Sequence, residues 1–427
     1  MAAKSGEAVR AVPPPLPEKA RTDWPPVVVA GAYQTAVVLM RNLARRGLRV
    51  CCFDCVSHFP GFKTVYGRGH HCPNPDLEPA AWLEFMTGLA RSMECRPVLM
   101  ATADQFVSAI DRHGDELEKD FIFARPKAGV QGILATKKRQ YDVAALHGLA
   151  VPRTRFVRSL EELTDFASTA RFPCLLKPDH FRDWQRFAPG HPLHYEKVAV
   201  AANAAELADK YRLAAPVTPE LMVQEVIQGP DTAKIVYLSC YGASGERIAS
   251  CLFRELRTCP IYFGSASVVE PVSDPEADAA CDAFLRGIGW QGLCEIELKR
   301  DMRDSRLQMI EANPRFSLTA DAAGYAGVDL GWIHYLDLIG KPVGPVYPDG
   351  RQFRHIALFR DFESYRDYLR EGLATWGDLI RSYRRPVAFL DFDLHDWRVT
   401  LGNLKGLAKL LLRPWYRRIF PRRVPAA

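Results

Sequence analysis

The chain has 427 residues, enough for two or three domains, and its 48% hydrophobic and 25% charged content is typical of a water-soluble globular protein. No apolar run approaches the roughly 18 residues that a membrane-spanning helix needs, and a formal net charge of only +6 argues against a nucleic-acid-binding protein. The 11 cysteines are an odd number in a chain without a recognisable export signal, so we expect reduced thiols and a cytoplasmic location.

Residues 1–24 are rich in proline and charge, which predicts a disordered leader. From 25 to 130, short apolar runs alternate with helical patterns. A strand ending near Gly31, a helix over 35–46 and a strand ending at Asp54 form a βαβ unit. The unit lacks a GxGxxG sequence, so we expect an open α/β layer that serves as scaffold and not a dinucleotide site.

A second domain is expected over 131–345, with its first lobe over 131–220. A helix begins near Lys137, and the apolar strand FPCLLK ends at Lys177. A polar and aromatic stretch, 180–196, follows this strand, and a loop of that length is usually functional or disordered.

Strands dominate the second lobe, 221–345, which opens with QEVIQGPD at 224–231. The stretch CEIELKRDMRDSRLQMIEANPRF, 294–316, predicts two strands joined by a polar turn. Side chains two apart share a face of a strand, so Glu295 lies beside Glu297. By the same alternation Glu311, Asn313 and Arg315 share a face of the second strand if it stays extended through Pro314. Hard oxygen ligands of this kind suit Mg²⁺. The alternative is an edge hairpin with a solvated polar face.

The Glu-x-Asn-x-Arg pattern of the second strand resembles the metal-binding hairpin of the ATP-grasp superfamily. The order of a lysine before Gly-x-x-x-Pro, a lysine at a strand end, a linker strand and an acidic hairpin also resembles that superfamily. The resemblance implies an α/β (α+β) fold in which an open pre-ATP-grasp layer precedes a two-lobed ATP-grasp module.

The resemblance also implies a role for each matching residue, with ATP and Mg²⁺ or Mn²⁺ as cofactors. Two lysines contact the nucleotide phosphates: Lys137, whose neighbour Lys138 leaves the assignment open, and Lys177. The linker takes adenine through Gln224, Glu225 and Ile227, and the ribose hydroxyls through Asp231. The metal ligands are Glu297, Glu311 and Asn313, with Glu295 in a supporting part. The loop at 180–196 stands where the superfamily has its phosphate-covering flap, with His180, Arg182 and Arg186 as contacts.

Such enzymes transfer the γ-phosphoryl group to a carboxylate, and an amine then attacks the acylphosphate, as in the D-aspartate ligase type of carboxylate–amine ligase. Arg315 is placed to steady the acylphosphate. Arg257, preferred to Arg254, is expected to orient the acceptor carboxylate, the alternative being a solvated strand arginine. We therefore expect small-molecule carboxylate and amine substrates and no nucleic acid.

Residues 346–427 form a C-terminal extension whose tail carries basic but no acidic side chains from Arg398 onward. Its amphipathic pattern fits either packing on the protein itself or peripheral contact with the inner face of a membrane. Two further functions stay open: a small-molecule kinase on the same fold, and an inactive nucleotide-binding interaction protein at a membrane.

Overall fold

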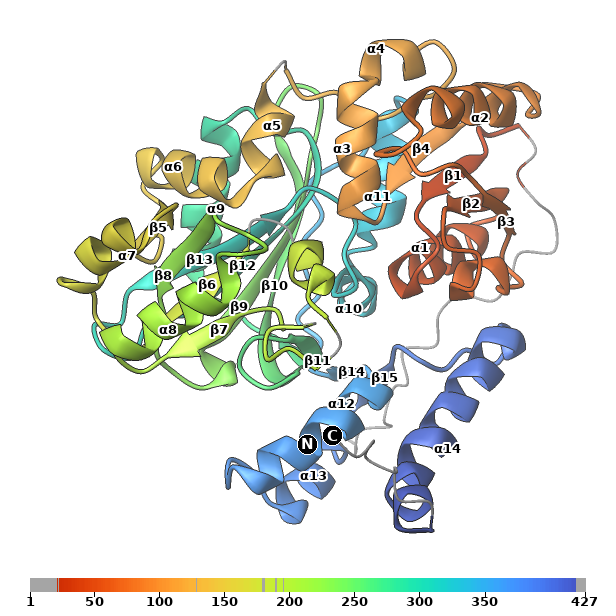
Figure 1. Ribbon diagram of the computed structural model, residues 1–427. Coiled ribbons are helices and arrows are strands. Elements are labelled where there is room, and N and C mark those ends of the chain that lie inside the picture. The colour runs from red at the N-terminus through yellow and green to blue at the C-terminus, as the bar shows by residue number, and fades with distance from the viewer. Residues whose placement is uncertain are drawn as a thin grey trace, which may run out of the picture.

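The computed structural model describes residues 21, 23–127, 129–178, 181–188, 190–194 and 196–419, which form three sheets flanked by helices (Figure 1). The predicted disordered leader lies almost wholly outside the described residues. All 11 cysteines are free thiols, as expected. Within the part of the chain that the structure describes, we find no helix with the length and apolar character needed to span a bilayer.

The N-terminal layer is a four-stranded parallel sheet in the order β3-β2-β1-β4. Its strands are β1 (Val27–Ala30), β2 (Val50–Asp54), β3 (Arg68–His71) and β4 (Val98–Ala101). Its helices are α1 (Gln34–Ala44), α2 (Pro79–Arg91), α3 (Asp104–Arg112) and α4 (Gly114–Leu117). Strands β1 and β2 are buried along their whole length and rich in Val, Cys and Phe, as parallel strands covered by helices on both faces must be. The βαβ unit expected at the start of the chain is therefore present.

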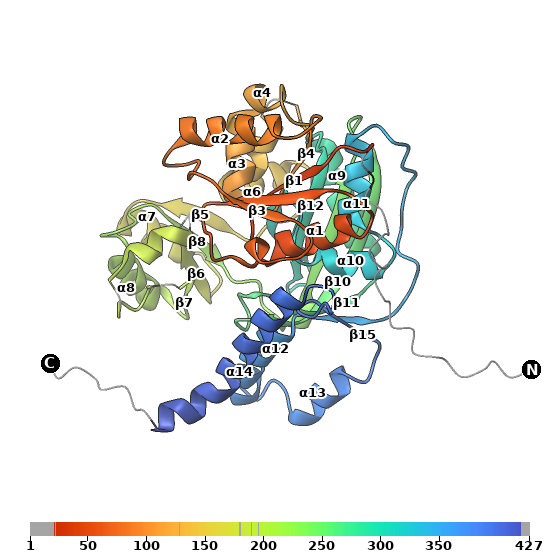
Figure 2. The same ribbon diagram turned by 90° about the vertical axis from the view of Figure 1, so that its right-hand side faces the viewer.

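The small lobe is a four-stranded antiparallel sheet in the order β5-β8-β6-β7. Its strands are β5 (Thr154–Val157), β6 (Cys174–Lys177), β7 (Ala199–Ala201) and β8 (Leu221–Glu225). Helices α7 (Leu160–Ala167) and α8 (Ala204–Ala214) lie side by side against it (Figure 2). Two helices precede it: α5 (Val130–Ala135) and α6 (Lys137–Leu146).

The loop expected to cover the phosphates contains a 3₁₀ helix, η2 (Phe181–Arg186), and contributes to the small lobe's core. Trp184 and Phe187 are buried there because large aromatic rings gain most from leaving water. Arg186 is exposed, whereas His180 and the side chain of Arg182 lie outside the described residues.

The large lobe is a seven-stranded sheet in the order β13-β12-β9-β10-β11-β14-β15, antiparallel except for its last pair. Its first five strands along the chain are β9 (Lys234–Tyr241), β10 (Arg247–Cys259), β11 (Ser265–Pro271), β12 (Gly292–Arg300) and β13 (Leu307–Asn313). A 3₁₀ turn, η3 (Asp231–Ala233), leads into β9, and α9 (Pro275–Gly287) packs on one face.

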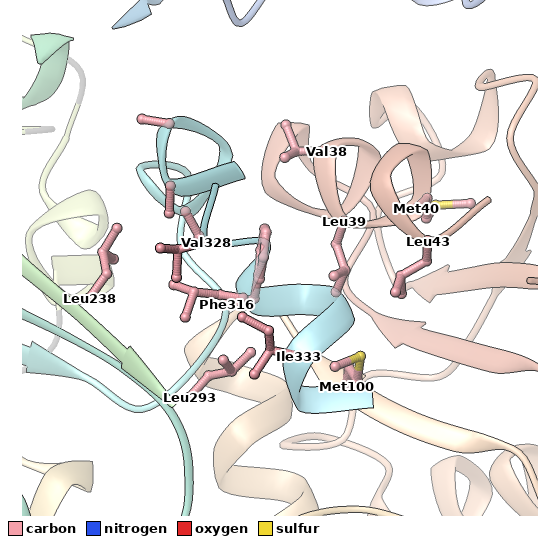
Figure 3. Packing of buried hydrophobic residues seen from close by; sticks show 14 of the residues in the cluster. Val38, Leu39, Met40, Leu43, Met100, Leu238, Leu293, Phe316, Val328 and Ile333 are labelled. Atoms are coloured by element: carbon pink, nitrogen blue, oxygen red, sulfur yellow. The ribbon is translucent and has the colours of Figure 1, made fainter. Parts of the chain in front are cut away.

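The opposite face of this sheet shares an apolar core with the N-terminal layer (Figure 3). Helices α10 (Ala320–Tyr325) and α11 (Leu330–Leu338) contribute to this core. Leu39 of α1 and Met100 of β4 belong to the same cluster as Ile333 of α11 and Leu238 of β9. The N-terminal layer is therefore docked on the large lobe through buried side chains.

The C-terminal stretch completes the large sheet instead of merely following it. Strands β14 (Arg354–Ile356) and β15 (Val387–Phe389) pair at its edge, so the sheet runs past residue 345. Helices α12 (Leu358–Arg370), α13 (Trp376–Ser382) and α14 (Trp397–Ile419) follow in the same stretch (Figure 1). The basic side chains at the end of α14 lie outside the described residues.

Candidate nucleotide and metal site

The acidic hairpin is formed by β12 and β13, which pair so that Glu297 lies directly opposite Glu311, and Glu295 opposite Asn313. A shift of register follows Glu297. The amide Nδ2 of Asn313 donates to Oε1 of Glu295 over 3.2 Å. Three carboxylates and one amide thus gather on two rigid neighbouring strands.

The two predicted phosphate lysines converge on Glu311. Lys137, the first residue of α6, forms an ion pair with its carboxylate. Burial alone would raise the pKa of Glu311, but Lys137, then Lys177 and Arg315, lower it to about 2. Glu311 is therefore ionised at any physiological pH, with cations already present where phosphates would bind.

The pKa of Glu297 is shifted in the opposite direction from that of Glu311. Burial, followed by repulsion from Glu255, Glu295 and Glu311, raises the pKa of Glu297 to about 8. Crowded buried carboxylates are unfavourable unless a cation compensates them, so this donor set fits a divalent ion.

The described residues contain no group of three or more His, Cys, Asp or Glu side chains arranged to hold a metal on their own. Glu297, Glu311 and Asn313 would instead share the ion with nucleotide phosphates, which is the arrangement that Mg²⁺ prefers.

Arg315 follows β13, and its guanidinium is held from two sides. Nη2 donates to Oδ1 of Asn313 over 3.3 Å, and Nε donates to Oδ1 of Asp104 over 2.5 Å. Asp104 begins α3 in the N-terminal layer. No sequence pattern links Asp104 to the hairpin, because 211 residues separate it from Arg315.

The linker expected to bind adenine has buried side chains that the protein itself already bonds. Gln224 donates to the hydroxyl of Thr154 over 2.8 Å and to that of Tyr141 over 3.1 Å. The Glu225 carboxylate accepts bonds from the backbone and side-chain nitrogens of Arg171, over 2.9 Å and 3.1 Å. Ile227 is also buried, so contacts with a base would come from the linker backbone.

Asp231 does not lie open for a sugar, contrary to the role expected for it. Its Oδ2 accepts from the Thr258 hydroxyl over 2.9 Å and from the Tyr368 hydroxyl, while Lys234 lies 3.3 Å from Oδ1. Tyr368 comes from α12, in the C-terminal stretch. The expected ribose contact is not supported, because the carboxylate is buried and its Oδ2 is already bonded, although Oδ1 accepts no hydrogen bond from the described residues.

The role expected for Arg257 needs a similar correction. Arg257 is 8% exposed and binds Asp361 of α12 through two hydrogen bonds of 2.6 Å and 2.8 Å. Its Nη2 also donates to Ser382 over 3.1 Å. This guanidinium holds α12 against the sheet and is not free to orient a substrate carboxylate.

Three further charged residues lie on the same sheet face, none of them predicted from the sequence as part of the site: Lys234, Glu255 and Lys299. Lys234 and Lys299 are opposite each other in the β9–β12 register, and both are buried. Lys234 lies 3.6 Å from Glu255, and burial raises the pKa of Glu255 to about 7. Burial and the neighbouring Lys234 lower the pKa of Lys299 to about 8. For Lys299, the sequence does contain a signal, because this residue continues the two-residue alternation of Glu295 and Glu297 along the strand.

No protein-family model matches the sequence. A D-aspartate ligase from Enterococcus faecium is 25% identical over 260 residues, which cover 57% of this chain and 59% of that protein's length. The N5-carboxyaminoimidazole synthetase from Staphylococcus aureus, solved in complex with ADP, has a TM-score of 0.61 at 13% identity and covers 83% of this chain and 87% of its own. The biotin carboxylase domain of the Hydrogenobacter thermophilus 2-oxoglutarate carboxylase, solved with MgADP, has a TM-score of 0.56 at 17% identity, with coverages of 74% and 70%.

These likenesses confirm the class of fold, the two-lobed α/β architecture expected from the sequence. The D-aspartate ligase, one relative of the sequence, is a ligase by name.

Proposed function

We propose that this protein is an ATP-dependent carboxylate–amine ligase that uses Mg²⁺. The observation that carries the proposal is the pair Glu297 and Glu311, opposite each other on β12 and β13, with Lys137 and Arg315 directed at the same place. Such a group of opposed charges is costly to bury for structural reasons alone, and it suits a metal-bound polyphosphate.

In the proposed reaction, a carboxylate oxygen of the first substrate attacks the γ-phosphorus of ATP, and the bond from that phosphorus to the bridging oxygen of ADP breaks. The nitrogen of the amine then attacks the acyl carbon, phosphate leaves with the carbon–oxygen bond electrons, and the nitrogen loses a proton. The products are an amide, ADP and phosphate.

Each of the chain's own groups has a part in this sequence. Lys137 and Lys177 hold the phosphates, and Mg²⁺ bound at Glu297, Glu311 and Asn313 would neutralise charge on the moving phosphoryl group. Arg315 donates to the oxygens of the acylphosphate or of its tetrahedral successor. Asp104 and Asn313 orient that guanidinium.

ADP release measured against panels of carboxylates and amines tests the proposal, and D-aspartate is the first substrate to try because the sequence relative is a D-aspartate ligase. ADP and free phosphate that appear only when both a carboxylate and an amine are present support the ligase. ADP release without an amine, with the phosphoryl group retained as an ester on a hydroxyl of the product, would identify a kinase. No ADP release under any condition, despite nucleotide binding, would favour the inactive alternative.

A further inference from the structure

Lys299 is 6% exposed as a residue, and within the part of the chain that the structure describes its ammonium forms no ion pair or hydrogen bond, although the ammonium is not fully enclosed. Buried charges are normally paired, because leaving one unpaired costs several kcal/mol. The other buried cations obey this rule. Their pairs are Arg41 with Asp321, Arg45 with Asp393, Lys234 with Asp231 and Glu255, and Arg257 with Asp361.

The surroundings of Lys299 explain why it lacks a partner. Its cross-strand neighbour is Lys234, a second cation, which already takes the nearby carboxylates of Asp231 and Glu255. Asp301, a third acid near Lys299, binds Arg303. Lys299 therefore forms no ion pair of its own with these acids, whose carboxylates act on its ammonium only from a greater distance.

The place of Lys299 in the site can be read from the strand. It follows Glu297 by two residues on the same face of β12, which corresponds to about 7 Å along the strand. The chain then reaches the hairpin turn, where the backbone nitrogen of Met302 donates to Gln228 of the linker over 3.0 Å. Lys299 thus lies between the metal end of the site and the end where the nucleoside is expected.

We propose that Lys299 binds the phosphate group of the nucleotide that lies nearest the nucleoside, as a cation supplied by the floor of the large lobe. This inference rests on the proposed function, because it requires a nucleotide between the lobes. Lys137 and Lys177 serve the far end of the phosphate chain, beside Glu311, and Lys299 serves the near end. A phosphate group bound beside Lys299 would give its ammonium the direct ion pair that the described protein groups do not provide.

The variant Lys299→Met keeps the approximate length of the side chain and removes its charge. Calorimetry then measures how tightly the wild type and the variant bind adenosine, AMP, ADP and ATP. We expect adenosine to bind as it does to the wild type, while AMP, ADP and ATP are each weakened by a similar factor of about 10 or more. Without nucleotide, the variant should melt at the same or a higher temperature, because an unpaired buried charge is gone. A purely structural lysine would not combine unchanged stability with lost phosphate affinity.

Lys299→Arg keeps the charge and should retain most of the affinity, and Lys299→Gln provides a second neutral variant if the methionine variant fails to fold. Lys119→Met, at an exposed lysine of the N-terminal layer, is the matched control and should change nothing. Unchanged binding of AMP and ADP to both neutral variants would overturn the proposal, and so would weakening confined to ATP or an equal loss of adenosine. Wild-type protein that binds none of the four ligands, with or without Mg²⁺, would overturn the proposed function itself.

Discussion

Two regions of this molecule bury charged side chains, and they differ in whether the protein itself pairs those charges. Where separate parts of the chain pack together, the buried charges form closed sets, in which each charge is bonded by an opposite charge of the protein. Arg257 is bonded twice to Asp361. Asp321 accepts from Arg41 over 2.7 Å and lies 2.8 Å from His355. On the face of the large sheet that carries the acidic hairpin, Glu297 is surrounded by other carboxylates, and Lys299 lies beside Lys234.

The difference shows how to separate structural from functional charges in one fold. A closed set is satisfied by the protein and fixes the position of an element, whereas an open set leaves charge for a ligand to compensate. By this criterion Arg257 belongs to the structure, and Glu297 and Lys299 belong to the site, where the neighbouring Glu311 is already paired with Lys137. The following substitutions test the criterion, starting with the largest expected effect.

Glu311→Gln removes a proposed metal ligand that lies directly opposite Glu297 of the open set. We expect ATP-dependent product formation to fall by at least about 100-fold, because stabilisation of phosphoryl charge is lost, while the protein remains folded. ADP release and circular dichroism measure the two effects, and Glu84→Gln at an exposed site is the control. Full activity in Glu311→Gln would show that the open set is not the catalytic site.

Asp361→Ala opens a closed set and leaves Arg257 buried without its carboxylate. The free energy of unfolding should fall by about 3–5 kcal/mol, as expected when one partner of a buried ion pair is deleted. Urea denaturation measures this change. Asp367→Ala, on the same helix but in a surface ion pair with Arg370, should cost no more than about 1 kcal/mol. Equal losses in the two variants would contradict the assignment of Arg257 to structure.

The Asp321 set predicts a dependence of stability on pH. Despite burial, Arg41 and His355 hold the pKa of Asp321 far below its usual range. The stabilisation is therefore fully present above the unfolded-state pKa of about 3.9 and is lost as the pH falls below it. The stability difference between wild type and Asp321→Asn should narrow as the pH is lowered from about 5 to 3. A difference that stays constant over this range would show that the ion pair contributes nothing.

Asp104→Asn tests a contact between the N-terminal layer and the site, since Asp104 accepts a hydrogen bond from the proposed catalytic Arg315. We expect kcat to fall by about threefold to tenfold with little change in the KM for ATP, because Arg315 is misplaced but still present. Asp104→Glu should restore part of the rate. A loss of stability without any change in kcat would mean that Asp104 only ties the N-terminal layer to the hairpin.

The strand alternation that predicted the acidic hairpin is local, and this explains why it could be read from the sequence. Glu297 and Glu311 meet because two short strands pair around a polar turn, and both strands carry their own pattern. The same alternation predicts Lys299, which was overlooked because a lysine in a strand usually reaches solvent.

The partners of Arg257 and Asp231 could not be predicted in this way. Asp361 follows Arg257 by 104 residues, and Tyr368 follows Asp231 by 137, both within a stretch expected to lie outside the ATP-grasp module. No local pattern reports that a later helix will pack on β10. The burial of Trp184 and Phe187 could not be predicted for a related reason. They lie in a loop rich in charge and proline, and no local pattern shows that these two rings pack into the core of the small lobe.

The continuous apolar core between α1, α11 and the large sheet has a mechanical consequence. Because one set of packed side chains spans the N-terminal layer and the large lobe, these two parts should move as a single body. The small lobe has a separate core of its own, made from residues 157–223. Relative motion of the lobes should therefore be a swing of the small lobe alone, while the strand that carries Glu297 and Lys299 keeps its position in the larger body.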